Sequence, residues 1–238
     1  MTGFTVGAAG VAVVALSIGG GSHANRSSPA LARTPAGVTR TSVAAPTSVA
    51  RRATHARPAA PSPGSLPQTH AYPSGTGTHF KSLMASLWSG ITHDSVGRAL
   101  VAFFPKGAYM QLKAIASGSS DWTNRLVHDY ALDIAAAHAL LGRDAARARL
   151  IAVDVPSSYG HWIPPGVCYN SIGYYELPNA RVVYREDGRT SSFGIASMIS
   201  WRGVWYVVHL GAILRSSDSG TVDAPASGRG TSEYSGTC

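Results

Sequence analysis

His209 is the side chain in this sequence best placed for acid–base chemistry. It lies in an apolar run from Val204 to Leu214, both alternating faces of which are otherwise apolar. An imidazole titrates close to neutral pH, so a histidine beside a cavity can act as a general base. The alternative, which we favour, is a core histidine whose ring nitrogens bond to a backbone carbonyl or a tyrosine, because buried polar groups are nearly always satisfied.

Asp133 is the acid with which His209 combines most readily. It borders the apolar stripe of a helix that the sequence predicts between Ser120 and Gly142. A half-buried carboxylate has a raised pKa and can act as a general base. We favour instead an ion pair with Arg149 or another arginine. An Asp133–His209 pair facing one cavity is the one acid–base combination that the sequence offers. The tyrosines that would add hydrogen-bond donors are Tyr130, Tyr174 and Tyr206.

Familiar catalytic and cofactor-binding motifs are missing from the sequence. It has no His-Glu-x-x-His zinc helix, no phosphate-binding loop and no Gly-x-Ser-x-Gly nucleophile turn. Residues 77–216 carry thirteen bases and nine acids, a near balance that disfavours nucleic-acid binding. We therefore expect no metal, no cofactor and no nucleic acid.

Cys168 and Cys238 are the only two cysteines, which excludes a disulfide-rich scaffold and a cysteine-based zinc module. In an exported protein the two can form a disulfide. Closing a loop of about 70 residues contributes roughly 4 kcal/mol in the chain-entropy model. The alternative is a buried free Cys168 and a Cys238 in an unstructured tail.

Helical periodicity dominates the chain before residue 146. Apolar residues recur at steps of three and one from Phe80 to Ile91, which predicts a helix. Asp94 is expected to cap a second, shorter helix that ends at Pro105. The third helix is the one predicted between Ser120 and Gly142, and residues 109–115 are ambiguous between helix and strand. The expected stripe of the third helix is Trp122, Leu126, Tyr130, Ile134, Ala137 and Leu141.

Strand-like alternation follows. Residues 149–155 alternate, and a loop is expected from Pro156 to Gly166. Asp187-Gly188 and Arg202-Gly203 are short turns of the kind that join hairpin strands. The predicted fold is α+β, with three N-terminal helices packed on a curved antiparallel β-meander that encloses a cone-like cavity. The four remaining strands are expected at 168–177, 180–186, 190–201 and 204–214.

This order of elements resembles the nuclear transport factor 2-like superfamily, which includes polyketide-cyclase-like and ketosteroid-isomerase-like proteins. The resemblance covers about residues 78–215 and depends on that order and on the closing pattern from Ile199 to Leu210, Ile-Ser-Trp-Arg-Gly-Val-Trp-Tyr-Val-Val-His-Leu. It implies a cone-shaped pocket, often a homodimer, and no fixed chemistry.

The first 24 residues predict export. Residues 4–18 are almost wholly apolar, and Ser22-His23-Ala24 has the small-x-small pattern of a signal-peptide cleavage site. The run is shorter than the roughly 20 residues of a spanning helix. We expect a cleaved signal peptide, or otherwise an anchor formed by residues 4–18. The protein would then be secreted or attached to the outer face of the cytoplasmic membrane.

Two further segments are expected to lie outside the folded domain. Residues 25–76 hold eight of the fourteen prolines and six arginines with no acid, which predicts a disordered linker. Residues 217–238 are rich in Ser, Gly, Thr and Asp and are expected to form a flexible tail. The α+β domain is predicted to span residues 77–216.

The export signal, the linker and the absence of a catalytic motif favour a non-catalytic domain that binds a small apolar ligand or a cell-envelope protein. The residues expected to contact a ligand are Tyr130, Asp133, Trp205 and His209. Two alternatives stay open. The second-ranked is a structural interaction domain whose cone is filled by Trp88, Trp205 and Phe193. The third is an isomerase- or cyclase-type enzyme that uses Asp133 and His209 as acid–base groups.

Overall fold

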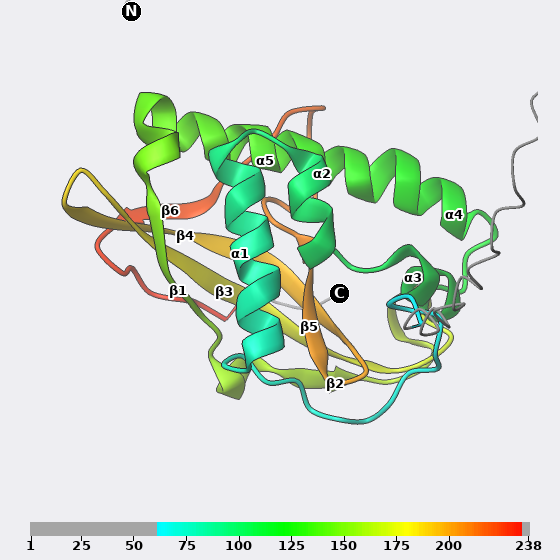
Figure 1. Ribbon diagram of the computed structural model, residues 1–238. Coiled ribbons are helices and arrows are strands. Elements are labelled where there is room, and N and C mark those ends of the chain that lie inside the picture. Colours follow the sequence, from blue (N-terminus) through cyan, green and yellow to red (C-terminus); the bar gives the residue numbers. More distant parts are fainter. Residues whose placement is uncertain (1–60, 235–238) are drawn as a thin grey trace, which may run out of the picture. The chain divides into compact units, whose positions relative to one another are not determined.

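The computed structural model describes residues 61–234, in which a helical half precedes the strands (Figure 1). Helix α1 (Thr78–Thr92) comes first, as the periodicity predicts. Its buried side chains recur at steps of three and four, so one face of the helix enters the core. They are Phe80, Leu83, Met84, Leu87, Trp88 and Ile91.

The predicted second helix is present as two short pieces. Helix α2 (Val96–Ala99) runs directly into the 3-10 turn η1 (Leu100–Ala102). Asp94 is not its cap, which corrects the expectation: Asp94 has a positive φ of 47°, and Ser95 takes the capping position. The chain makes a tight turn between α1 and α2 because Asp94 adopts this left-handed conformation.

The ambiguous stretch 109–115 begins as helix and ends extended. Helix α3 (Lys106–Leu112) buries Tyr109 and Leu112, which are three residues apart and share one face. The next residue, Lys113, has extended dihedral angles and forms an isolated backbone bridge with Asn170. This change of conformation is what brings the Lys113 side chain to the sheet.

The third helix is confirmed, but it is built from three consecutive segments. Helix α4 (Gly118–Asp121) is followed by a π-helical turn, η2 (Trp122–Leu126), and then by α5 (Val127–Leu141). Gly142 ends α5 with a positive φ of 63°, as a helix-terminating glycine does. Single π turns inside α-helices often occur at functional sites. The short 3-10 turns that follow are η3 (Gly142–Arg147), η4 (Ser157–Tyr159) and η5 (Val167–Tyr169).

The described residues form a six-stranded antiparallel sheet. Its order is β1-β3-β4-β5, with β2 also paired to β3 and β6 also paired to β4. Both predicted hairpin turns are confirmed, and all four of their residues, at 187–188 and 202–203, have positive φ. The strands are β1 (Arg149–Asp154), β2 (His161–Ile163), β3 (Tyr174–Glu186), β4 (Arg189–Trp201), β5 (Val204–His209) and β6 (Asp223–Ser227).

Three strand predictions need correction. The strands expected at 168–177 and 180–186 are one strand, β3, which continues through Asn179 at a positive φ of 57°. The loop expected from Pro156 to Gly166 contains β2. The last hairpin strand, β5, ends at His209 and not at Leu214, because the chain turns there toward α5.

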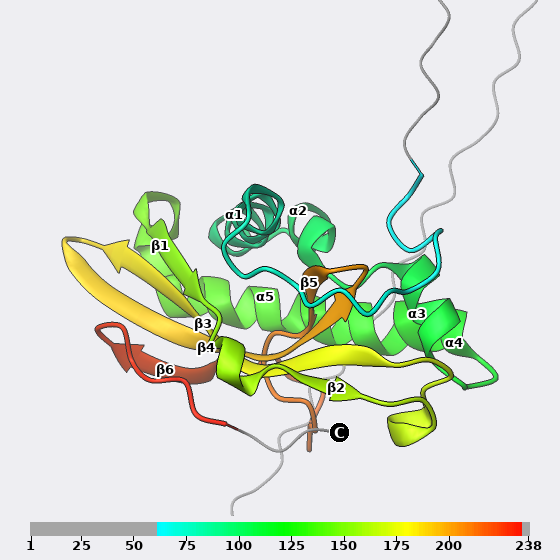
Figure 2. The same cartoon turned by 90° about the horizontal axis from the view of Figure 1, so that it is seen from below.

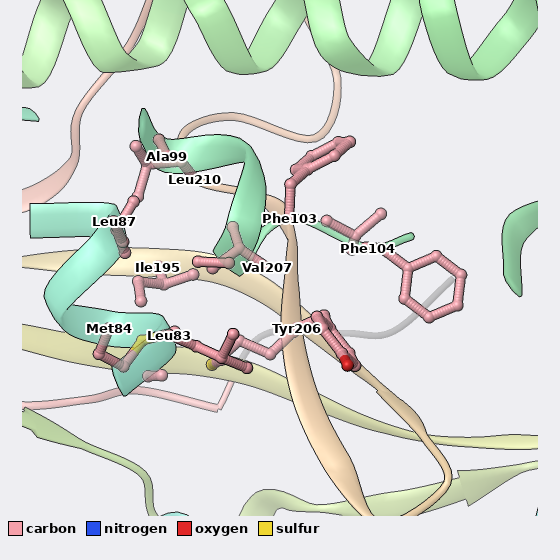
Figure 3. Packing of buried hydrophobic residues seen from close by; sticks show 14 of the residues in the cluster. Leu83, Met84, Leu87, Ala99, Phe103, Phe104, Ile195, Tyr206, Val207 and Leu210 are labelled. Carbon is pink, nitrogen blue, oxygen red and sulfur yellow. The ribbon is translucent and has the colours of Figure 1, made fainter. Parts of the chain in front are cut away.

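The central strand β4 is covered on both faces. Helices α1, α2 and α5 lie together on one side of β3 and β4 (Figure 2). Leu83 and Leu87 of α1 lie beside Ile195 of β4 and Val207 of β5 in the core (Figure 3). All ten residues from Ser192 to Trp201 are buried, so the second face of β4 is covered as well.

The predicted boundary of the N-terminal linker is wrong. Residues 61–76 pack on the domain instead of extending from it. Gln68 Nε2 donates to Ser200 O at 2.9 Å, and the ring of His70 stacks on Trp162 with centroids 3.7 Å apart. Composition could not show this, because the segment has few apolar residues and docks through single aromatic and amide side chains. Residues 25–60 lie outside the described range.

The predicted flexible tail is also wrong over residues 217–234. This segment contains β6, whose backbone pairs with β4. Arg229 bonds through Nη2 to both carboxylate oxygens of Asp154 at 2.9 and 3.0 Å. The segment covers a sheet edge, a long-range contact that local composition does not encode.

Cys168 is disulfide-bonded. The chain's other cysteine, Cys238, lies outside the described residues, so the Cys168–Cys238 pairing stays a prediction. No helix within residues 61–234 is long and apolar enough to span a membrane. The apolar segment 4–18 and the cleavage pattern at 22–24 also lie outside that range.

Candidate ligand-binding site

A cavity of about 490 Å³ lies where α3 and the π turn η2 meet β3, β4 and β5. One of its walls is the segment that follows β5, through Ile213 and Leu214. The polar and charged lining residues are Tyr109, Lys113, Arg125, Tyr174, Glu176, Ser197 and His209. The apolar lining residues are Leu126, Ile199, Val208, Ile213 and Leu214.

Glu176 is the most deeply buried charged group of this lining, with 4% of its surface exposed. Its position in β3 places it on the same face as Tyr174, two residues earlier. Ser197 Oγ donates a hydrogen bond to Glu176 Oε1 at 3.2 Å, whereas Oε2 has no hydrogen-bond partner among residues 61–234. Burial raises the pKa of Glu176, and Ser197, His161 and Lys113 offset part of that rise.

Lys113 brings an ammonium group to the same cavity. Its Nζ donates a hydrogen bond to the backbone carbonyl of Cys168 at 2.9 Å. Burial is the main cause that lowers the pKa of Lys113, and the charge of Arg125 lowers it further, while Glu176 and Asp121 act in the opposite direction. The lysine is held in place because its backbone is bridged to Asn170 where α3 ends.

Arg125 lies in the π turn and is paired within its own helix. Its Nε and Nη2 donate to the two carboxylate oxygens of Asp121, both at 2.7 Å. Tyr109 donates from its hydroxyl to Asp121 Oδ2. The hydrogen bonds from Arg125 lower the pKa of Asp121, and burial raises the pKa of Tyr109. Arg125 therefore reaches the cavity with its charge already balanced by Asp121.

His209 lines the cavity at the end of β5, partly buried. Burial lowers its pKa to about 4, and the charges of Arg125, Arg215 and Lys113 add to that effect. The ring is therefore neutral at pH 7. Of the four residues predicted to contact a ligand, His209 is the one that lines the cavity.

Asp133 serves a different purpose. It is 1% exposed and does not line the cavity. Its carboxylate accepts hydrogen bonds from Gly211 N at 2.8 Å, Thr221 N at 2.9 Å and Arg215 Nη2 at 2.6 Å. The ion-pair interpretation is confirmed, with Arg215 and not Arg149 as the partner, and Asp133 ties the segment 211–221 to α5. The structure does not bring Asp133 and His209 together at one cavity.

Tyr130 and Trp205 are core residues in the structure. Tyr130 donates a hydrogen bond from its hydroxyl to Ala99 O at 3.1 Å and stacks on Phe103. Trp205 is fully buried, with its ring edge-on to Tyr72. Trp88 and Phe193, the other two side chains of the filled-cone alternative, are buried in the same core. Tyr206 also packs in the core (Figure 3), whereas Tyr174 lines the cavity.

The three charged residues of the cavity, Lys113, Arg125 and Glu176, are not predicted from the sequence. For Glu176 a signal exists, since it is the one acid in an otherwise apolar and aromatic strand segment, two residues from Tyr174. Lys113 and Arg125 carry no such signal. Their approach to the cavity depends on the end of α3 and on the π turn, and neither feature follows from a hydrophobic pattern.

Comparisons with protein-family models, with curated proteins and with solved structures find no match to this chain. Within the described part of the chain, no three His, Cys, Asp or Glu side chains lie together as a metal site requires.

Proposed function

We propose that this domain binds a small molecule with an apolar body and one polar group in the cavity beside Glu176. The observation that carries the proposal is the cavity of about 490 Å³, in which the partly buried Lys113 and the carboxyl of Glu176 lie beside apolar walls. Among residues 61–234, Lys113 Nζ donates to one acceptor, the carbonyl of Cys168. An ammonium group has three N–H donors, so Lys113 can also bind a polar group of a ligand.

The rest of the cavity suits an apolar body. Its volume lies within the range of small-molecule pockets. Leu126, Ile199 and Val208 form apolar walls around the polar groups, and Leu214, 90% exposed, extends the apolar lining to the surface. Seven of the twelve lining residues carry a polar or charged group, but most of the lining surface is apolar, as is usual for a ligand site.

Binding is better supported than acid–base catalysis. Both oxygens of Asp133 are occupied by donors from the segment 211–221, so Asp133 is not available to a substrate. His209 is neutral over the physiological pH range and has no carboxylate partner in any hydrogen bond or ion pair of residues 61–234. The isomerase- or cyclase-type alternative loses the acid–base pair on which it depended.

The proposal keeps two expectations from the sequence. The first is that the helices and the antiparallel sheet form a cone of the nuclear transport factor 2-like kind, with this cavity as its open end. The second is that the protein is exported and is secreted or held at the outer face of the cytoplasmic membrane. The disulfide bond of Cys168 supports an oxidising compartment.

A neutral apolar dye tests the binding function on the full-length chain. N-Phenyl-1-naphthylamine fluoresces strongly in apolar surroundings, and we expect it to bind at one site per chain. Ile213 lines the cavity and is 42% exposed, so Ile213→Trp fills the cavity from its surface side without altering the core. Leu140 on α5 is 41% exposed and is not a cavity residue, which makes Leu140→Trp the matched control.

We expect Ile213→Trp to abolish the saturable dye signal and Leu140→Trp to leave it unchanged. Equal binding by both variants would show that the dye binds elsewhere and would overturn the proposal. Far-UV circular dichroism of each variant establishes that a loss of binding is not a loss of fold.

A further inference from the structure

Building on the binding function proposed above, we propose that the ligand is a free monocarboxylic acid with an apolar tail. Its carboxylate is held by Lys113, beside a Glu176 carboxyl that carries a proton.

Lys113 supplies the positive charge. An ammonium group has three N–H donors, and within residues 61–234 Lys113 Nζ donates to one acceptor, the carbonyl of Cys168. No carboxylate oxygen of that range lies within 4.0 Å of Lys113 Nζ. A partly buried cation without a counter-ion is costly, and a ligand carboxylate beside Lys113 supplies both the charge and the acceptors.

The charges of the cavity wall leave Lys113 as the unbalanced group. Arg125 is matched by Asp121 through two hydrogen bonds. Glu176 is the one remaining acid of the lining, and it forms no ion pair with Lys113 in the described residues. When Glu176 carries a proton, the wall has a net charge of one positive unit, which a monoanion neutralises.

Glu176 accommodates the ligand by taking up a proton from solvent. The groups that face it are His161 from β2, Ser197 from β4, Tyr174 on its own strand and Lys113 from the end of α3. Burial already raises the pKa of Glu176, and a second carboxylate nearby raises it further. Once protonated, the carboxyl no longer repels the ligand carboxylate, and Ser197 Oγ still bonds to Oε1. No covalent bond forms or breaks.

The charges around His209 also favour a negatively charged ligand. Burial is the largest cause of the lowered pKa of His209, and the charges of Arg125, Arg215 and Lys113 lower it further, so three cationic side chains lie near this wall of the cavity. An alkylammonium ligand would be repelled there. A carboxylate is attracted, and its negative charge raises the pKa of His209.

Three eight-carbon probes that differ only in their polar group test this inference: octanoate, octan-1-ol and octylamine. Isothermal titration calorimetry of the full-length chain at pH 6.5 measures their affinities. We expect octanoate to bind at least about tenfold more tightly than octan-1-ol, as expected for a hydrogen-bonded charge pair, and octylamine to bind most weakly. Repeating the octanoate titration in buffers of different ionisation enthalpy should show uptake of a proton.

Lys113→Met identifies the residue responsible. We expect this variant to lose at least about tenfold in octanoate affinity and to keep its octan-1-ol affinity. Lys81, on the exposed side of α1, provides the control: Lys81→Met removes the same charge and should leave both affinities unchanged. Unchanged binding of N-phenyl-1-naphthylamine shows that the cavity of Lys113→Met is intact.

The outcomes separate the two proposals. If octan-1-ol binds as tightly as octanoate, or if Lys113→Met weakens neither probe, the carboxylate inference is overturned and the binding function stands. If the dye binds but octanoate does not, the inference again fails alone. If neither the dye nor any of the three probes binds, both proposals are wrong.

Discussion

Glu176 and His161 lie opposite each other on β3 and β2, with Glu176 Oε2 3.9 Å from His161 Nε2. His161 Nδ1 lies 2.9 Å from Tyr159 O, a contact that assigns the hydrogen to Nδ1 and leaves Nε2 of the neutral ring as an acceptor. Two buried acceptors therefore lie side by side. Burial raises the pKa of Glu176, and a proton on this carboxyl relieves the conflict.

We predict that Glu176→Gln stabilises the protein at pH 7. A carboxyl whose pKa is raised on folding holds its proton more tightly in the folded chain. The free energy of unfolding therefore falls as pH rises from the ordinary value of 4.5 through the raised folded pKa. Glutamine removes the buried charge, so the gain should be on the order of 1 kcal/mol at pH 7 and should shrink toward pH 4.5.

Urea denaturation of Glu176→Gln at several pH values measures this. Glu233, exposed near the end of the described range, provides the control, since Glu233→Gln should change neither the stability nor its pH dependence. A Glu176→Gln variant that is less stable than the wild type at pH 7 would mean that the ionised carboxylate is satisfied in the folded protein, and that the conflict with His161 does not exist.

His209 gives the opposite pH dependence. Its folded pKa of about 4 lies below the ordinary 6.5, so the unfolded chain binds the proton more tightly. The stability that His209 contributes is present above pH 6.5 and is lost as pH falls from 6.5 to about 4. We predict that His209→Asn removes this loss, which amounts to up to about 3 kcal/mol.

Thermal melts of the wild type and His209→Asn between pH 7 and 4 provide the measurement. The same substitution at exposed His79, at the start of α1, should retain the pH slope of the wild type. An NMR titration of the His209 ring that gave an ordinary pKa would contradict the prediction directly. Above pH 4.5 the slopes from Glu176 and His209 oppose each other, so each is resolved only in the single variants.

The predicted Cys168–Cys238 disulfide has a direct test. Intact mass spectrometry of the exported protein should show the loss of two hydrogens relative to the reduced chain. Because the bond closes a loop of about 70 residues, Cys168→Ser should lower the free energy of unfolding by roughly 4 kcal/mol in the chain-entropy model. Adding a reductant should destabilise the wild type and leave Cys168→Ser unchanged. Equal sensitivity of both proteins to reductant would exclude the pairing.

The sequence predicts the elements of this fold well wherever a local pattern determines them. The periodic apolar residues of α1 and α5 and the two positive-φ turns at 187–188 and 202–203 are local features, and all appear as expected. Segments that fold by long-range contact are missed. The segment at Gln68 and His70 and strand β6 have the composition of linkers, and they are ordered by partners such as Ser200 and Trp162.

The candidate site is predictable only in part, for a related reason. His209 stands out as a titratable group in an apolar strand, and it lines the cavity. Asp133 stands out equally on its helix, yet its partner Arg215 is 82 residues away and takes it out of the cavity. Lys113 lines the cavity because the chain is extended at that residue, directly after the end of α3. The sequence pattern identifies side chains that are unusual within their helix or strand. Which of these side chains contact one another depends on the tertiary structure.

The role of Asp133 as the anchor of the segment 211–221 gives the last prediction. Its carboxylate joins the two ends of the segment, at Gly211 and Thr221, and its charge is matched by Arg215, whose side chain is 10% exposed. Breaking a buried ion pair from one side leaves the other charge uncompensated and costs about 3–5 kcal/mol. Asp133→Asn should therefore destabilise the protein by about 3 kcal/mol. The loss is at the lower end of that range because Arg215 Nε still lies 3.5 Å from the carboxylate of Asp129.

Arg229→Ala is the matched comparison for Asp133→Asn, since Arg229 pairs with Asp154 in the same C-terminal region but with both side chains largely exposed. An exposed pair contributes at most about 1 kcal/mol, so the two variants should differ clearly in urea denaturation. Hydrogen exchange adds a local readout: the amide hydrogens of Gly211 and Thr221 should exchange faster in Asp133→Asn and at the wild-type rate in Arg229→Ala. If Asp133→Asn kept both its stability and the protection of those two amides, the segment would be held by contacts other than Asp133. The apolar wall that Ile213 and Leu214 give the cavity would then not depend on this carboxylate.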